Sequence, residues 1–190
     1  MFDYNNIIKD ENPDLRKICK DVKIPLEKED IETLKQMSDY LKLGYEEDAR
    51  EKYNIRPGVG IAAPQIDVLK RMFVIMAFDE KDVLYHFGVI NPKIISESVE
   101  MCYLENGEGC LSVTDEHKGY IHRPKRIKAK FYCYDFEKDE CFLVTEKFKG
   151  YISIVFQHEY DHLDGKLFFD HINKDNPFYV PENSGPIVFK

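Results

Sequence analysis

Hydrophobic and polar residues alternate between residues 127 and 134, and this pattern predicts a half-buried β-strand. A turn-like sequence at 137–139 separates it from a second segment at 141–148, so the two segments predict a β-hairpin. Two further runs, at 72–78 and 83–90, are rich in branched and aromatic residues and also predict strands. The middle of the chain is therefore expected to form a sheet.

Helical spacing of hydrophobic residues is found on both sides of this region. Over 26–51, apolar side chains recur on one stripe and charges fill the other faces, which predicts one long helix. A shorter helix is expected over 12–22, because Asn12 is a good capping residue and a proline follows it. A late helix is predicted over 152–164. Helices, then strands, then one helix indicate an α+β fold in one domain, 1–190.

Composition and charge restrict the classes of function. Hydrophobic residues make up 43% of the chain, enough for a core, but no apolar run reaches the ~18 residues of a membrane span. The net charge of −8 argues against nucleic-acid binding. The start of the chain lacks a signal-peptide pattern, so a cytoplasmic protein without membrane association is expected. The five scattered cysteines argue against a disulfide framework.

The strongest chemical signal is the sequence His-Glu-Tyr-Asp-His at 158–162. On a helix, His158 and His162 lie on one face, one turn apart, so both can reach a single ion. Glu159 lies about 100° around the helix, beside that ion without being a ligand. Two imidazoles, a metal ion and a nearby base are the parts of a metal-assisted hydrolase. A buried amphipathic helix with two histidines by chance is the alternative.

A catalytic site of this type usually has a third protein ligand and one open position. One family of metallopeptidases places it six residues after the second histidine, where this chain has Phe168. His171 comes three residues too late to take this place. Glu182 is another candidate for the third ligand, but it lies in a loop-like stretch that is not expected to hold a ligand rigidly. Cys110, in Glu-Gly-Cys-Leu-Ser at 108–112, is an upstream candidate because a bound metal deprotonates a thiol. Taken alone, a free cysteine is more often a small buried hydrophobe.

A loop of small residues at 58–65 reads Gly-Val-Gly-Ile-Ala-Ala-Pro-Gln and, alone, indicates only a tight turn. It matches neither a dinucleotide-binding fingerprint nor a phosphate loop. With 108–112 and 157–162, however, it resembles the peptide deformylases, whose motifs G-x-G-x-A-A-x-Q, E-G-C-L-S and Q-H-E-x-D-H occur here in that order. The resemblance spans roughly residues 1–173, and the run 119–123 is similar to the larger form found in Gram-positive bacteria.

The resemblance implies antiparallel sheets around a central helix that carries the metal histidines, and removal of the formyl group from the N-terminal methionine of newly made proteins. The implied ligands of one divalent ion are Cys110, His158 and His162. Fe²⁺ is the usual ion of the family, and Zn²⁺, Ni²⁺ or Co²⁺ would suit the same donors. Glu159 would be the general base. The Gln65 side chain and the Leu111 N–H would donate to the oxyanion.

The resemblance also implies where substrate binds. The implied substrate-binding residues are Gly58, Val59, Gly60, Tyr151, Ile154 and Val155. The last three precede the metal histidines and, with Val59, would line an apolar pocket for methionine. The glycines would leave room for the small formyl group and for a strand-like peptide contact. Formyl-methionyl nascent peptides are the implied partner. Contact with the ribosome stays open, because the chain after Asn173 is not the basic helix of some members.

Two other functions predict different behaviour. A general zinc endopeptidase would cleave internal peptide bonds, although Phe168 stands where its third histidine is expected. A non-catalytic, metal-stabilised binding module would need a fourth ligand and would leave Glu159 idle. Arg123 is a candidate to pair with Glu108 or Asp161 behind the site. No role beyond surface or packing is expected for His86, His117, His122 and His171.

Overall fold

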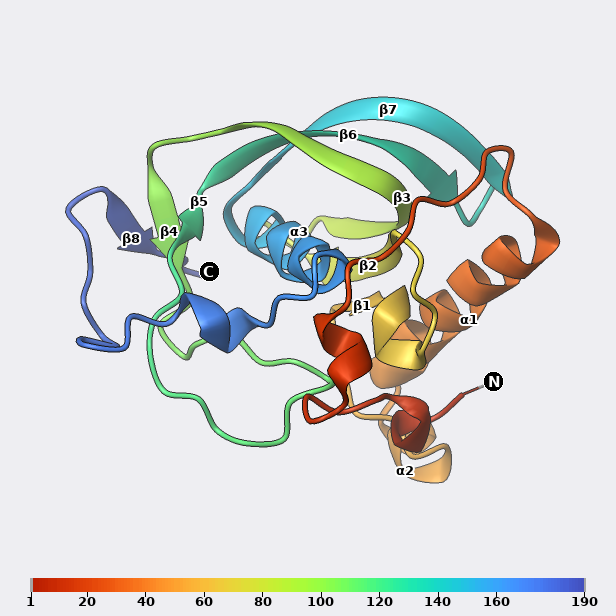
Figure 1. Ribbon diagram of the computed structural model, residues 1–190, viewed down its shortest axis with the longest axis horizontal. Helices are drawn as coiled ribbons and strands as arrows, with labels where there is room; N and C mark the ends of the chain where they lie inside the picture. The colour runs from red at the N-terminus through yellow and green to blue at the C-terminus, as the bar shows by residue number, and fades with distance from the viewer. Residues whose placement is uncertain (1, 190) are drawn as a thin grey trace.

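A five-stranded antiparallel sheet organises the computed structural model, which describes residues 2–189 (Figure 1). Its strands, in spatial order, are β1 (Gly60–Ala62), β2 (Met72–Phe78), β3 (Leu84–Glu97), β6 (Arg126–Asp135) and β7 (Glu140–Lys149). The predicted hairpin is confirmed, because β6 and β7 pair along their whole length. The strand predicted over 83–90 is longer than expected, since β3 continues to Glu97 and follows β6 through two register shifts.

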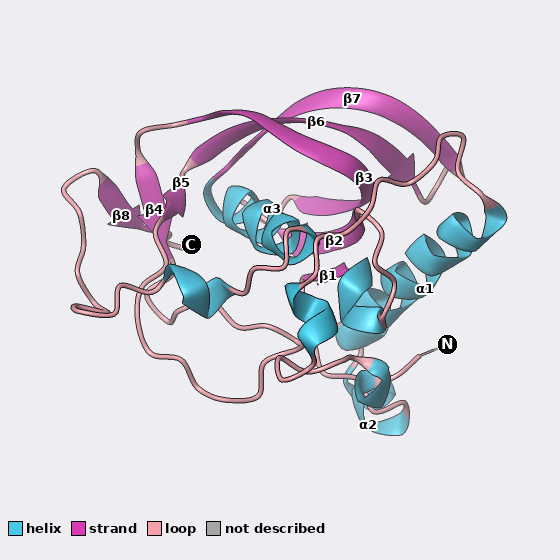
Figure 2. Cartoon of the chain, viewed as in Figure 1, coloured by secondary structure: helices cyan, strands magenta, loops and turns pink. Residues whose placement is uncertain are grey.

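Helix α3 (Gly150–Leu163) lies in the hollow of this curved sheet, with β6 and β7 arching over it (Figures 1 and 2). Aromatic rings fill the space between helix and sheet. Their centroids lie 4.9 to 6.1 Å apart, and they belong to Phe73, Phe131, Phe148 and Phe156. The continuous apolar segment before residue 157 is thus explained by burial on several sides.

The start of α3 is fixed by the loop between β2 and β3. Gly150 has a φ of 58°, and a Cβ added there would lie 1.8 Å from the Glu80 carboxylate. Glu80 accepts a hydrogen bond from the Tyr151 N–H at 2.9 Å. This bond satisfies one of the free donors of the first helical turn and places a negative charge at the positive end of the helix dipole. The residues that follow on α3 are therefore held in a defined register.

Helices α1 (Lys28–Gly44) and α2 (Glu47–Lys52) form the N-terminal part, and α1 packs against β2. The prediction of a single helix over 26–51 is wrong, because the chain turns after Gly44. The Gly44 carbonyl has lost its partner within the helix and accepts a hydrogen bond from Arg50 Nε at 2.6 Å. That contact folds α2 back onto the end of α1.

The helix predicted over 12–22 is only a short 3₁₀ turn, η2 (Pro13–Arg16). Asn12 caps it as expected, accepting a hydrogen bond from the Asp14 N–H at 2.9 Å. The chain then leaves the helical path, because the Cys19 N–H donates to the carbonyl of Leu163 at the end of α3. Ile18, within the segment predicted to be helical, is consequently 74% exposed.

A small second sheet lies beside the start of α3 (Figure 1). It consists of β5 (Arg123–Pro124), β4 (Met101–Tyr103) and β8 (Ser184–Pro186). The β4–β8 pair is parallel, so the expectation of antiparallel sheets holds for the large sheet and is wrong for this pair. The loop-like stretch that contains Glu182 ends in β8, which the sequence did not predict.

Three further 3₁₀ turns complete the secondary structure: η1 (Tyr4–Asn6), η3 (Ala63–Ile66) and η4 (Phe168–His171). Within residues 2–189, no helix combines the length and hydrophobicity needed to cross a bilayer.

Candidate metal and catalytic site

Helix α3 and the loop that follows β4 bring three metal-binding side chains together. His158 and His162 lie one turn apart on α3 and face Cys110 of the loop. One ligand atom from each of the three lies within 4.8 Å of the others, and Cys110 Sγ is 3.3 Å from His162 Nε2. Residues far apart in sequence thus form one cluster, as the metal-site expectation required.

The chemistry of this cluster fits a divalent transition-metal ion. A thiolate and two imidazoles are donors that such ions accept. Burial raises the pKa of the Cys110 thiol, but the nearby His162 and His158 lower it by more than burial raises it. The pKa of Cys110 therefore lies well below its usual value, and the thiolate is favoured. Glu159 Oε2 is buried beside the cluster without a hydrogen-bond partner among residues 2–189, as expected where a polar ligand belongs.

A buried ion-pair network holds the cluster from behind. Glu108 Oε2 accepts a hydrogen bond from His158 Nδ1 at 2.8 Å, which leaves the other ring nitrogen for the cluster. Arg123 donates to both oxygens of Glu108, at 2.5 and 3.0 Å, and to Asp161 at 2.8 Å. The sequence suggested Arg123 as a partner of Glu108 or Asp161, and it pairs with both. His171, expected to have no role, lies 2.8 Å from Asp161.

The network is charged although it is almost completely buried. Burial raises the pKa of the Glu108 carboxyl, but Arg123 and His158 outweigh burial and hold it at about 2. Burial opposes ionisation of Asp161 too, and His171 and Arg123 bring its pKa to about 2. Burial lowers the pKa of Arg123, and the two carboxylates raise it far above its usual value. All three side chains are therefore ionised at neutral pH.

Glu159 lies on α3 next to the cluster and is 4% exposed. Burial raises the pKa of its carboxyl to about 7, and the nearby Cys110 acts in the same direction. A carboxyl that titrates near neutral pH is suited to accepting a proton and giving it back. Gly60 on β1 leaves room for the Glu159 carboxylate, because a Cβ added at Gly60 would lie 2.4 Å from Glu159 Oε1.

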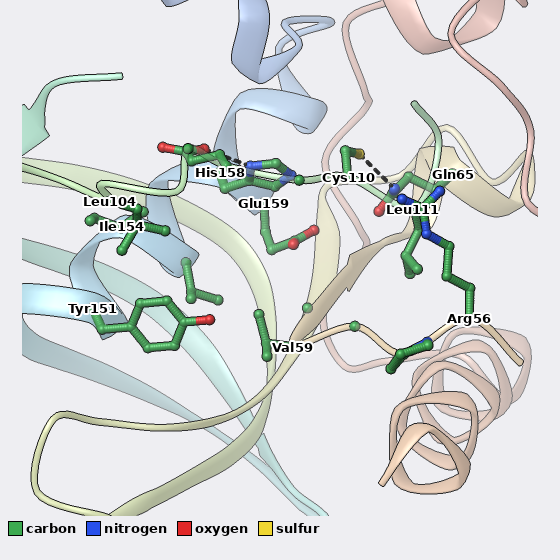
Figure 3. Close-up of a pocket in the computed structure, with 17 residues that line it drawn as sticks. Arg56, Val59, Gln65, Leu104, Cys110, Leu111, Tyr151, Ile154, His158 and Glu159 are labelled. Atoms are coloured by element: carbon green, nitrogen blue, oxygen red, sulfur yellow. Dashed lines mark hydrogen bonds and ion pairs between the residues drawn. The ribbon is translucent and has the colours of Figure 1, made fainter. Parts of the chain in front are cut away.

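Two hydrogen-bond donors lie beside Cys110 on the side of β1 (Figure 3). Gln65 Nε2 donates to Ser112 Oγ at 3.1 Å and to Cys110 Sγ at 3.4 Å. Gln65 Oε1 accepts from the Ala62 N–H at 2.9 Å, which fixes the orientation of the amide. The Leu111 N–H finds no acceptor in the described part of the chain. A negative charge that develops near Cys110 could therefore meet two donors.

These groups open onto a cavity of about 320 Å³. Every predicted site residue except His162, which is 1% exposed behind the cluster, lines it. Tyr151, Ile154 and Val59 form an apolar side of the cavity (Figure 3). Arg56 and Leu104 also line the cavity and were not anticipated, because neither lies within a motif. Only the path of the chain places them there.

The edge strand β1 borders this cavity. In the sheet order β1 has a neighbour on one side only, β2. The Val59 carbonyl accepts a hydrogen bond from the Met76 N–H at 2.9 Å. Because the backbone groups of an antiparallel strand alternate in direction, Gly60 presents its N–H and C=O to the open side. An extended peptide could pair with this edge.

Comparison with known proteins points to one family. The family model described as polypeptide deformylase matches residues 4–178. Peptide deformylase 2 of Bacillus subtilis is 43% identical over 184 residues, which cover 97% of each chain. Peptide deformylase 2 of Geobacillus stearothermophilus is 44% identical over 187 residues, which cover 98% of this chain and 99% of its own.

Solved structures agree. The crystal structure of peptide deformylase from Thermotoga maritima is 34% identical, with a TM-score of 0.64 over 88% of this chain and 96% of its own. A class I type b peptide deformylase from Acinetobacter baumannii, crystallised with Met-Ala-Ser bound, is 29% identical, with a TM-score of 0.63 over 87% and 96%. The chain therefore belongs to the polypeptide deformylase family, metal-dependent hydrolases that remove the formyl group from the N-terminus of newly made proteins.

Proposed function

We propose that Cys110, His158 and His162 hold one divalent ion, Fe²⁺ in the cell, and that this cleft hydrolyses the formyl amide of formyl-methionyl peptides. The observation that carries the proposal is the approach of the three ligand atoms to within 4.8 Å at one end of the cleft, beside Glu159. Zn²⁺, Ni²⁺ and Co²⁺ suit the same donors. Metal analysis of protein purified without oxygen decides between the ions.

The proton transfers are assigned to Glu159. When bound, the ion supplies Lewis-acid chemistry and lowers the pKa of a water from 15.7 toward about 7. Glu159 accepts the proton that this water loses on attacking the formyl carbon. It then gives the proton to the amine nitrogen as the C–N bond breaks. The products are formate and a peptide with a free N-terminal methionine.

The developing negative charge on the formyl oxygen is assigned to the donors beside Cys110. The Leu111 N–H is without an acceptor in the described structure, and the Gln65 amide is held in place through Ala62. Each donor of this kind is typically worth about 3 kcal/mol of the barrier. A donor that is already oriented costs no reorganisation when the charge forms.

Substrate selection is assigned to the two sides of the cleft. Tyr151, Ile154 and Val155 would receive the methionine side chain, because the first turns of α3 present them to the cavity. Gly60 would pair with the peptide backbone, a contact that reads sequence weakly. A peptide that begins with methionine, Met-Ala-Ser, was bound in the crystal structure of the relative from Acinetobacter baumannii.

Paired substrates separate this function from its alternatives. Purified protein is given formyl-Met-Ala-Ser, acetyl-Met-Ala-Ser and a longer peptide with a blocked N-terminus. We expect release of formate from the first and no cleavage of the other two. A general endopeptidase would cut the longer peptide at internal bonds. A non-catalytic binding module would leave all three intact.

The cellular setting follows from this substrate. We propose that residues 1–190 act as one domain in the cytoplasm, where formylated chains are made. We also propose that the protein binds the ribosome transiently. Co-sedimentation with translating and empty ribosomes tests it.

A further inference from the structure

The last described residues of the chain run beside two walls of the cleft. The Ile187 N–H donates to the Tyr103 carbonyl at 2.9 Å and so continues the pairing between β8 and β4. Leu104, the next residue along from Tyr103, lines the cleft. Two residues further along the tail, the Phe189 ring meets the Tyr151 ring edge to face, with the centroids 5.0 Å apart. The end of the described chain therefore contacts Tyr151, a residue of the cleft wall, on the side away from the cavity.

Neighbouring tail residues differ in their surroundings. Val188 is 70% exposed, whereas Phe189 is 52% exposed because one side of its ring lies on Tyr151. Ile187 is half-buried, and Val188, which lies between Ile187 and Phe189, makes no aromatic contact within the described chain. Tyr151 itself stands on the first turn of α3, and its hydroxyl is directed along the cleft toward Val59 (Figure 3). The chain thus supplies both a candidate residue and a matched control beside it.

We propose that Phe189 is a positioning residue for substrate selection: by packing on Tyr151 it holds that ring as a wall of the pocket for the first side chain of the substrate. The inference rests on the proposed function, in which this pocket receives methionine. Phe189 does not line the cavity, so it acts through Tyr151. The Tyr151 backbone is fixed by Glu80, but nothing in that bond fixes the direction of the ring. The edge-to-face contact with Phe189 constrains that direction from the outside, in addition to the packing of Tyr151 against the hydrophobic core.

The test compares Phe189→Ala, Phe189→Tyr and Val188→Ala. KM and kcat are measured for formyl-Met-Ala-Ser and for formyl-Ser-Ala-Ser. We expect Phe189→Ala to raise KM for the methionine peptide roughly two- to tenfold, the range of one aromatic pair, with kcat within about twofold of wild type. Preference for methionine over serine should fall by a similar factor. Phe189→Tyr should restore both values, and Val188→Ala should match wild type.

Coupling to Tyr151 distinguishes positioning from a general effect on folding. Phe189→Ala should have no further effect on KM in a Tyr151→Ala background, because the ring it positions is absent. Thermal unfolding of each variant checks that the fold persists. Wild-type KM and selectivity in Phe189→Ala, or equal changes in Val188→Ala, would overturn the inference. Failure of wild-type protein to release formate would instead count against the proposed function itself.

Discussion

At the scale of single residues, Arg123 joins the two buried carboxylates behind the metal cluster. Its guanidinium is 4% exposed and bridges Glu108, which orients His158, and Asp161. Removing one partner of a buried ion pair leaves the other partner as an uncompensated charge. Loss of the Arg123 guanidinium would leave two buried carboxylates, those of Glu108 and Asp161, without this positive charge.

Arg123→Gln should therefore lower the free energy of unfolding by about 3–5 kcal/mol, measured by urea denaturation. Arg126→Gln is the matched control, because Arg126 pairs with Glu100 at the surface, where the Arg126 side chain is 57% exposed. We expect little change in that variant. Equal effects of the two substitutions would show that the buried network does not stabilise the fold.

Gln65 provides a second test at this scale, because no local pattern connects it with the metal cluster. Gln65→Leu removes one oxyanion donor and should reduce kcat for formyl-Met-Ala-Ser about 10²-fold or more, with a smaller change in KM. Metal content should stay at the wild-type value. Unchanged kcat would remove Gln65 from the mechanism.

At the scale of elements, the site depends on the close approach of β1 to α3. Gly60 is buried, and the carboxylate of Glu159 occupies the position where a side chain would begin. Close packing of this kind leaves no space for one more carbon without displacing a neighbour.

Gly60→Ala should displace Glu159 and lower kcat for formyl-Met-Ala-Ser at least tenfold, while Cys110, His158 and His162 still bind the ion. Activity and metal content of the same preparation are the measurements. Full activity in this variant would mean that the position of Glu159 is not critical.

The same scale shows what local sequence patterns could and could not predict. The β6–β7 hairpin was predicted from the alternation within β6 and the turn-like sequence after it, and α3 was predicted from its apolar run and the spacing of its two histidines. The break between α1 and α2 was not predicted, since it depends on Arg50 reaching the Gly44 carbonyl. The pairing of β8 with β4 could not be predicted either, because a strand of three residues is too short to show a periodic pattern.

Prediction of the site was limited in the same way. The predicted site residues of the three motifs lie together in the structure, and all of them except His162 line one cavity. Arg56 and Leu104, outside every motif, were missed. Phe189 carried no signal at all, because its contact with Tyr151 depends on the path of the whole tail.

At the scale of the whole molecule, the ion should contribute to stability as well as chemistry. Its ligands come from α3 and from the loop after β4, so binding ties two separate segments together. A ligand that binds only the folded state raises its stability by mass action.

Removal of the metal by a chelator should therefore lower the melting temperature, and returning Fe²⁺ or Co²⁺ should restore it. Cys110→Ser should lose most of this difference, and the exposed Cys141→Ser should keep it. Differential scanning calorimetry under argon makes the comparison. A metal-dependent shift of wild-type size in Cys110→Ser would exclude that thiolate as a ligand.

The most direct test of the account is formate release from formyl-Met-Ala-Ser by anaerobically purified protein, with Glu159→Ala measured at the same metal occupancy. We predict that wild type releases one formate per Met-Ala-Ser produced. We predict that the variant keeps its ion but turns over at least ~10²-fold more slowly, because the group that carries the proton is missing. Equal rates in the two proteins, or loss of the ion from the variant, would contradict the role of Glu159. Absence of formate with wild type would contradict the function.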